Sequence, residues 1–228
     1  EGEFGSSIAA LGDLDGDGVT EIAAGEIEGG PGIRPGAVHV MFMNVDGTVK
    51  SITKIGHNVG GGPNLNNYDL FGRMIEPLGD LNGDGIVDIA VGAMRDDTGE
   101  NDSGAVHLLL LNSNGTVKSS SKIGNDLRGG PILASGDSFG NAITNLGDIN
   151  GDGIIDLVVG AWSEDTGGAS RGALYVLSLS PAVDFGDAPD ASIGTEAGNY
   201  NTTAEDYGPS HTITQALYMG TTVDGDDG

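Results

Sequence analysis

The sequence predicts an all-β chain made of three four-stranded units of the kind that form the blades of a propeller. Three observations carry this prediction. One long stretch recurs three times, each copy holds short apolar runs separated by turn residues, and no segment keeps the 3.6-residue apolar period of a helix. The 228 residues include 42 glycines and only 5% aromatic side chains, which is typical of many turns and short strands.

The repeated stretch begins with Phe-Gly and runs through an acidic loop into an apolar segment. The copies read "FGSSIAALGDLDGDGVTEIAAGE" from Phe4, "FGRMIEPLGDLNGDGIVDIAVGA" from Phe71 and "FGNAITNLGDINGDGIIDLVVGA" from Phe139, with starts 67 and 68 residues apart. Downstream, "GAVHVMFMNVDGTVKSITKIG" (36–56) matches "GAVHLLLLNSNGTVKSSSKIG" (104–124), whereas the third copy gives only "GALYVLSLS" (172–180). We therefore expect blades at about 4–70, 71–138 and 139–180.

Each unit is expected to hold four strands, which the second copy shows most clearly. They lie at about 72–78, 87–93, 105–111 and 117–123, separated by "NGDG", "DDTGENDSG" and "NSNG". Tandem units of this kind indicate propeller blades rather than separate hairpins, because a lone hairpin is only marginally stable. The repeated Phe is expected to pack between neighbouring blades, with the Gly after it permitting close backbone approach.

The acidic loop places oxygen-bearing side chains at the same offsets in all three copies. Counted from the first acid, the side chains stand at offsets 0, 2, 4 and 8, with a backbone carbonyl at offset 6 as a natural further ligand. Calcium takes 6–8 oxygen ligands in a flexible geometry, whereas magnesium demands a tighter octahedron. The sequence thus predicts three Ca²⁺ sites. Their ligands are Asp13, Asp15, Asp17, Val19 and Glu21; Asp80, Asn82, Asp84, Ile86 and Asp88; and Asp148, Asn150, Asp152, Ile154 and Asp156.

A helical EF-hand is excluded for these loops, although it begins in the same way. An EF-hand needs a bidentate acid at position 12 and a following helix. Position 12 here is Ala24, Val91 or Val159, and each lies inside an apolar run that reads as a strand. Metal-free turns are the remaining alternative, and the recurrence of the same offsets in three loops disfavours it.

The repeat "FG…LGDLNGDGIVDIAVGA…GAVHLLL" resembles the FG-GAP repeat of the integrin α-chain propeller and of many bacterial surface proteins. The resemblance covers about Phe4 to Ser180. It implies that each repeat is a four-stranded blade, that the acidic loop binds calcium, and that the protein is secreted or lies at the cell surface.

Charge and composition exclude several classes of function. Thirty-four acidic residues against 9 basic ones give a formal net charge of −25, which disfavours nucleic acid as a partner because phosphate binding needs a basic face. The absence of cysteine excludes disulfides and thiolate metal sites, and no apolar run reaches the length of a membrane span. No nucleophile motif accompanies a base, so we expect no enzymatic activity.

Three blades are fewer than the 4–8 of a closed propeller, so we expect partners that complete the ring. Three resolutions stay open: the chain is a fragment of a longer propeller protein, several chains complete a ring, or chains join head to tail in an open filament. Residues 1–180 form the blades, and 181–228 are an acidic extension in which "HTITQALYMG" (211–220) reads as a strand. Two roles stay open for this strand: completing the third blade in cis, or adding to a neighbouring chain.

The first functional hypothesis is a calcium-stabilised structural module of a surface assembly, such as a filament. The alternative is an integrin-like adhesion domain that binds a protein or glycan ligand through its blade loops. A third and weaker hypothesis makes the chain part of a secreted hydrolase.

Overall fold

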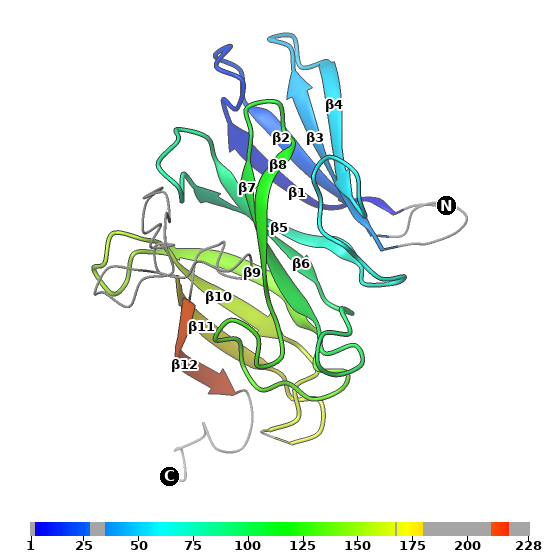
Figure 1. Cartoon of the computed structure of the whole chain (residues 1–228), viewed down its shortest axis with the longest axis vertical. Coiled ribbons are helices and arrows are strands. Elements are labelled where there is room, and N and C mark those ends of the chain that lie inside the picture. The colour runs from blue at the N-terminus through cyan, green and yellow to red at the C-terminus, as the bar shows by residue number, and fades with distance from the viewer. Residues whose placement is uncertain (1–2, 28–34, 167, 180–210, 219–228) are drawn as a thin grey trace, which may run out of the picture.

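Twelve strands in the described residues form three four-stranded antiparallel sheets (Figure 1). The structure is a computed structural model that describes residues 3–27, 35–166, 168–179 and 211–218. No helix occurs in these ranges, so the described chain contains none that could span a membrane. The predicted all-β fold class of three four-stranded, propeller-type blades is confirmed.

The first sheet has the order β1-β2-β3-β4 and the second the order β5-β6-β7-β8. The first sheet comprises β1 Phe4–Gly12, β2 Glu21–Glu26, β3 Ala37–Met43 and β4 Val49–Gly56, and the second β5 Phe71–Gly79, β6 Asp88–Ala93, β7 Ala105–Leu111 and β8 Val117–Ile123. The strands expected in the second copy agree with the observed ones within one residue at each end.

The third sheet consists of β9 Phe139–Gly147, β10 Asp156–Ala161, β11 Ala173–Leu179 and β12 His211–Tyr218. Strand β12 comes from the C-terminal extension and pairs antiparallel with β11, from Ala173 opposite Tyr218 to Leu179 opposite His211. The extension thus contributes the fourth strand in cis. Addition of the same strand to a neighbouring chain stays a prediction, as does the domain boundary at residue 180.

The first strands of the sheets lie against one another in chain order, β1 beside β5 and β5 beside β9. Figure 1 shows the sheets following one another along the length of the molecule. Two hydrophobic clusters fill the spaces between them. Phe71 and Ile75 join the first cluster with residues of the first sheet, and Phe139 and Ile143 join the second cluster with residues of the second sheet.

The Phe-Gly pair that opens each later blade has the packing role predicted for it. Phe71 and Phe139 are fully buried. Each packs edge-on against an aromatic ring on the third strand of its own sheet. The ring centroids are 5.3 Å apart for Phe71 and His107 and 5.7 Å apart for Phe139 and Tyr175. Gly72 has φ +93°, and a Cβ added to it would lie 2.4 Å from the carbonyl oxygen of Ala37 in the preceding blade. Only glycine fits this combination of backbone angle and contact.

Candidate metal centre

The three acidic loops lie at equivalent places, each between the first and second strand of its sheet. The glycines at offset 5, Gly18, Gly85 and Gly153, have φ angles of 87°, 84° and 89°. This left-handed conformation is the one that glycine adopts without strain, and it lets the loop turn back toward its first acid.

The first acid of each loop organises the backbone around its carboxylate. Asp13 accepts hydrogen bonds from the amide of Gly16 at Oδ1 (2.8 Å) and from the amide of Gly18 at Oδ2 (2.9 Å). Asp80 accepts in the same way from Gly83 and Gly85, and Asp148 from Gly151 and Gly153. These backbone amides hold the pKa of Asp148 below its usual value, Gly153 contributing most.

The acid at offset 8 begins the second strand and is fully buried in every sheet, as Glu21, Asp88 or Asp156. Each accepts a hydrogen bond from the backbone amide at offset 1. Glu21 Oε2 receives it from Leu14 (2.7 Å), Asp88 Oδ2 from Leu81 (2.9 Å) and Asp156 Oδ2 from Ile149 (2.9 Å). The buried carboxylate therefore has two roles: it fixes the start of the loop through this hydrogen bond, and it is a candidate metal ligand. The offsets in the sequence indicate only the second role.

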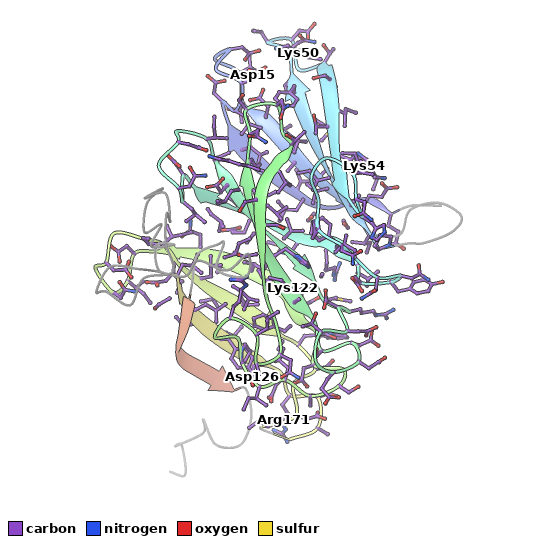
Figure 2. The ribbon with its side chains drawn as sticks, viewed as in Figure 1. Asp15, Lys50, Lys54, Lys122, Asp126 and Arg171 are labelled. Atoms are coloured by element: carbon purple, nitrogen blue, oxygen red, sulfur yellow. The ribbon has the colours of Figure 1, made fainter. Side chains whose placement is uncertain are left out.

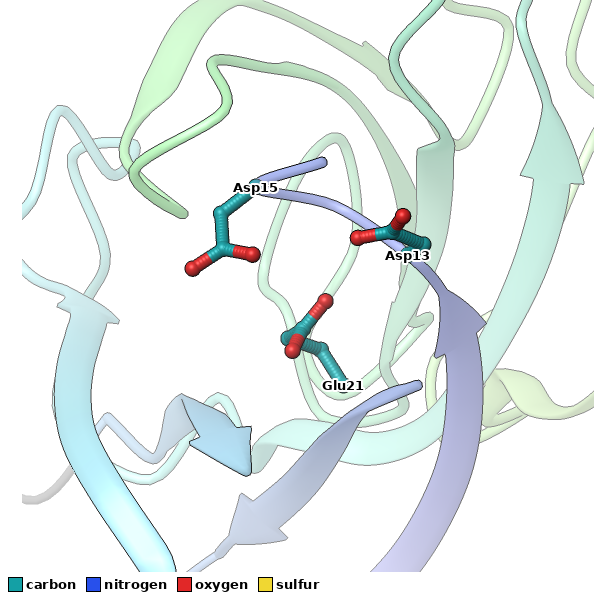
Figure 3. A group of neighbouring side chains, drawn as sticks. All are labelled: Asp13, Asp15 and Glu21. Carbon is teal, nitrogen blue, oxygen red and sulfur yellow. The ribbon is translucent and has the colours of Figure 1, made fainter. Parts of the chain in front are cut away.

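Three carboxylates of the first loop converge. Asp13, Asp15 and Glu21 each offer an oxygen within 4.8 Å of the others, and Figure 3 shows their carboxyl groups turned toward a common space. Glu21 Oε1 is buried and has no hydrogen-bond partner in the part of the chain that the structure describes. An uncompensated buried carboxylate oxygen is expensive, and a cation bound among the three groups would satisfy it. This donor set of hard oxygens fits calcium.

The second and third loops differ from the first by an amide at offset 2 and by Asp in place of Glu at offset 8. Asn82 Oδ1 accepts a hydrogen bond from the Asp84 amide (2.9 Å), and Asn150 Oδ1 accepts one from the Asp152 amide (2.8 Å).

Burial raises the pKa of Asp88 to about 6. The backbone amides of Leu111 and Leu81 oppose this rise, while the carboxylates of Asp84 and Asp80 add to it.

The acid at offset 4 accepts a hydrogen bond from the backbone amide two residues later in each loop. The pairs are Asp17 with Val19, Asp84 with Ile86, and Asp152 with Ile154. The structure brings Asp13, Asp15 and Glu21 of the first loop together, and Asp17 is not part of this group. Among the described residues, no three acids of the second or third loop lie that close to one another. Coordination by any of the fifteen predicted ligands, including the three backbone carbonyls, stays a prediction.

Two lysines were missed by sequence reasoning. Lys50 Nζ lies 3.0 Å from Asp15 Oδ2 and 3.0 Å from Asp17 Oδ2, and Lys118 Nζ lies 3.1 Å from Asp84 Oδ2. Figure 2 shows Lys50 beside Asp15 at the end of the first sheet. The sequence did offer a signal for these lysines, because both stand at the same position of a repeated "GTVKS" segment. The hydrogen bond from Lys50, followed by that from the Val19 amide, lowers the pKa of Asp17.

Asp69 is a buried carboxyl outside the loops. Its Oδ2 accepts a hydrogen bond from the Asn66 amide at 2.7 Å, but its Oδ1 has no hydrogen-bond partner within the described ranges. Burial raises its pKa to about 6; the Asn66 amide opposes the rise, and the carboxylate of Asp96 adds to it. Since the charged form is disfavoured in the folded state, Asp69 lowers stability increasingly as pH rises from about 4 to about 6.

Asp69→Asn is therefore expected to raise the free energy of unfolding by about 1–2 kcal/mol at pH 7.5 and to change it little at pH 4. Thermal unfolding at several pH values and a fixed calcium concentration measures this difference. The control is Asp126→Asn, which removes the same charge from an exposed site. An equal effect of the two variants at every pH would contradict the assignment.

Comparison with known proteins agrees with the repeat structure. Residues 4–41, 77–109 and 139–177 match the FG-GAP repeat. Integrin alpha-5 of Xenopus laevis is 38% identical over 194 residues, which cover 78% of this chain and 17% of the relative. Integrin alpha-4 of Xenopus laevis is 29% identical over 167 residues (72% of this chain, 15% of the relative). Integrin alpha-E of Mus musculus is 31% identical over 134 residues (58% and 10%). The chain spans about a sixth or less of the length of these relatives.

Proposed function

Because the chain carries three FG-GAP repeats, we propose that it is a calcium-stabilised extracellular module with a structural or adhesive role and no catalytic one. The observation that carries the proposal is the convergence of Asp13, Asp15 and Glu21 around a buried carboxylate oxygen that has no hydrogen-bond partner among the described residues. The same loop architecture recurs in the other two sheets, so we assign one Ca²⁺ to each loop.

Calcium supplies in these loops the positive charge that lets several carboxylates share one small space. Asp13, Asp15, Asp17 and Glu21 would hold the ion in the first loop, and the second and third loops use their equivalents. The chain's own contribution is preorganisation, because the loop amides already orient the first acid and the strand already buries the last one. Calcium fits better than magnesium, since a long and mixed set of oxygens suits the larger ion.

The cellular role that we propose is that of a building block in a larger surface assembly, with a filament as one form of it. Further blades, of the same polypeptide or of other copies, would complete the propeller. Similarity to integrin alpha chains favours a second role, adhesion through a protein or glycan ligand bound across the blade loops. We also propose that the chain belongs to a bacterial surface protein, since many such proteins carry the same kind of repeat.

Calorimetric titration of the metal-free chain with Ca²⁺ tests the proposal. The expected result is three ions per chain, with Glu21→Gln binding two because the first loop loses a charged ligand. Glu100→Gln, at an exposed position outside the loops, serves as the control and should still bind three. A wild-type chain that binds no calcium, or Mg²⁺ that binds as tightly as Ca²⁺, would overturn it.

Lys50 and Lys118 are expected to compete with calcium in the first and second loops. Each lysine must leave its carboxylate partner before the ion can use that oxygen. Lys50→Gln should therefore raise the calcium affinity of the first loop by roughly two- to five-fold, the range of a screened surface ion pair, and more at low salt. Lys118→Gln should act in the same way on the second loop.

The titration includes Lys54→Gln as a matched control, because Lys54 is paired with Glu26 outside the loops. Equal affinities in all three variants and the wild type would show that the lysines do not compete with the ion.

A further inference from the structure

The three acidic loops differ in the negative charge that they offer to a cation. The first loop holds carboxylates at all four side-chain offsets, whereas the other two hold three each, because Asn82 and Asn150 replace the acid at offset 2. The affinity of a calcium site depends on the number of charged ligands and on the rigidity of the site. Charge alone therefore favours the first loop.

The acids at offset 8 of the second and third loops already use both of their carboxylate oxygens. Asp88 accepts hydrogen bonds from two backbone amides, that of Leu111 at Oδ1 (2.9 Å) and that of Leu81 at Oδ2 (2.9 Å). Asp156 accepts one from the backbone amide at offset 1 and, at Oδ1, one from the side-chain amide of Asn150 (3.3 Å). A cation in either loop must share these oxygens with donors that are already bound to them.

The acid at offset 8 of the first loop has an oxygen to spare. Glu21 is fully buried, and only its Oε2 accepts a hydrogen bond, from the amide of Leu14. Its Oε1 has no such partner among the residues that the structure describes. The longer glutamate side chain brings this oxygen toward Asp13 and Asp15, with which it forms the converging group of Figure 3. In the described ranges the acids of the other two loops form no such group.

We propose that the first loop binds calcium before the other two and about ten-fold more tightly or better, and that Glu21 sets this order. An ion in the first loop satisfies a buried oxygen that is otherwise unpaired, and it displaces no hydrogen bond there. The inference rests on the proposed calcium function and adds to it the order of filling. The chain then responds to calcium in two stages, the first loop at low concentration and the others at higher concentration.

The lysines beside the loops oppose this order without reversing it. Lys50 contacts two carboxylates of the first loop, whereas Lys118 contacts one carboxylate of the second, so competition is stronger in the first loop. The two lysine side chains are 46% and 52% exposed, and solvent and salt weaken exposed ion pairs. Glu21 is buried, where attraction between opposite charges is screened much less.

Calorimetric titration of the full, metal-free chain with Ca²⁺ at about 0.15 M salt tests the order. The wild type is expected to bind one ion in a tight phase and two in a phase about ten-fold weaker or more. Glu21→Asp gives the first loop the same acid at offset 8 as the others, so it should move the first ion into the weaker phase while three ions still bind. A tight phase that survives Glu21→Asp would overturn the role of Glu21.

Asp17→Asn and Asp84→Asn are a matched pair that assigns the tight phase to a loop. Both residues are exposed, stand at offset 4 and contact a lysine, but they belong to the first and the second loop respectively. Asp17→Asn should weaken the tight phase by roughly ten-fold, and Asp84→Asn should leave it unchanged and weaken one of the later ions. The opposite pattern would overturn the assignment, and because both sites are exposed the pair decides it even if Glu21→Asp fails to fold.

The same titration separates this inference from the proposed function. A wild type that binds three ions with equal affinity would remove the order of filling and leave the proposed calcium function in place. A wild type that binds no calcium would remove the proposed function, and the order of filling with it.

Discussion

Removal of calcium with EGTA is expected to lower the melting temperature of the chain by about 10 °C or more. A ligand at 1,000 times its Kd stabilises a fold by about 4 kcal/mol per site, and 1 kcal/mol shifts the melting temperature of a domain of this size by about 2–4 °C. The metal-free first loop keeps Asp13, Asp15 and Glu21 close together, so the folded state also retains their mutual repulsion.

Differential scanning calorimetry with and without EGTA measures the shift. Restoring excess Ca²⁺ should recover the original melting temperature, whereas the same concentration of Mg²⁺ should recover only part of it. NaCl at matched ionic strength controls for screening of the net charge. If EGTA leaves the melting temperature unchanged, the loops do not stabilise the fold through calcium.

The strands and loops could be predicted from sequence because the chain repeats its own pattern. Each Phe-Gly pair, acidic loop and apolar run recurs in order, so an ambiguous segment in one copy is decided by the others. The turns of the loops could be predicted as well, because the sequence places glycine where the backbone adopts a positive φ angle.

The fourth strand of the third sheet was harder to predict because it breaks the repeat. Strand β12 contains no "GTVKS" segment and follows β11 only after a long interval, so the sequence left its partner open. Its pairing with β11 is a long-range contact that depends on the unpaired edge of that strand. Local patterns do not encode such a choice.

The missed features of the candidate site are side-chain contacts across the fold. Lys50 reaches Asp15 and Asp17 from another strand, across more than 30 residues of sequence. Asp69, outside the loops, has a local hydrogen-bond partner in Asn66, whereas the charges of Asp96 and Lys122 that act on it come from other parts of the chain. Offsets within one loop identify candidate ligands, whereas competition for those ligands depends on which strands lie beside the loop.

Gly92→Ala is expected to destabilise the chain by about 3 kcal/mol or more, which corresponds to a fall in melting temperature of about 6–12 °C. The added Cβ would lie 2.0 Å from the carbonyl oxygen of Gly140. That oxygen is backbone in the third sheet, so no side-chain rotation relieves the clash. The third sheet must move away from the second, and the packing of Phe139 and Ile143 between them is lost.

Gly160→Ala is the matched control, because Gly160 occupies the equivalent position of β10 and its new Cβ would meet only ordinary contacts at 3.5–3.8 Å. Neither glycine has a positive φ angle, so backbone strain does not distinguish the two variants. Restricting the unfolded chain should make Gly160→Ala neutral or up to about 1 kcal/mol more stable. Thermal unfolding at concentrations where the monomer dominates compares them, and equal losses in both variants would show that blade-to-blade contact is not what Gly92 serves.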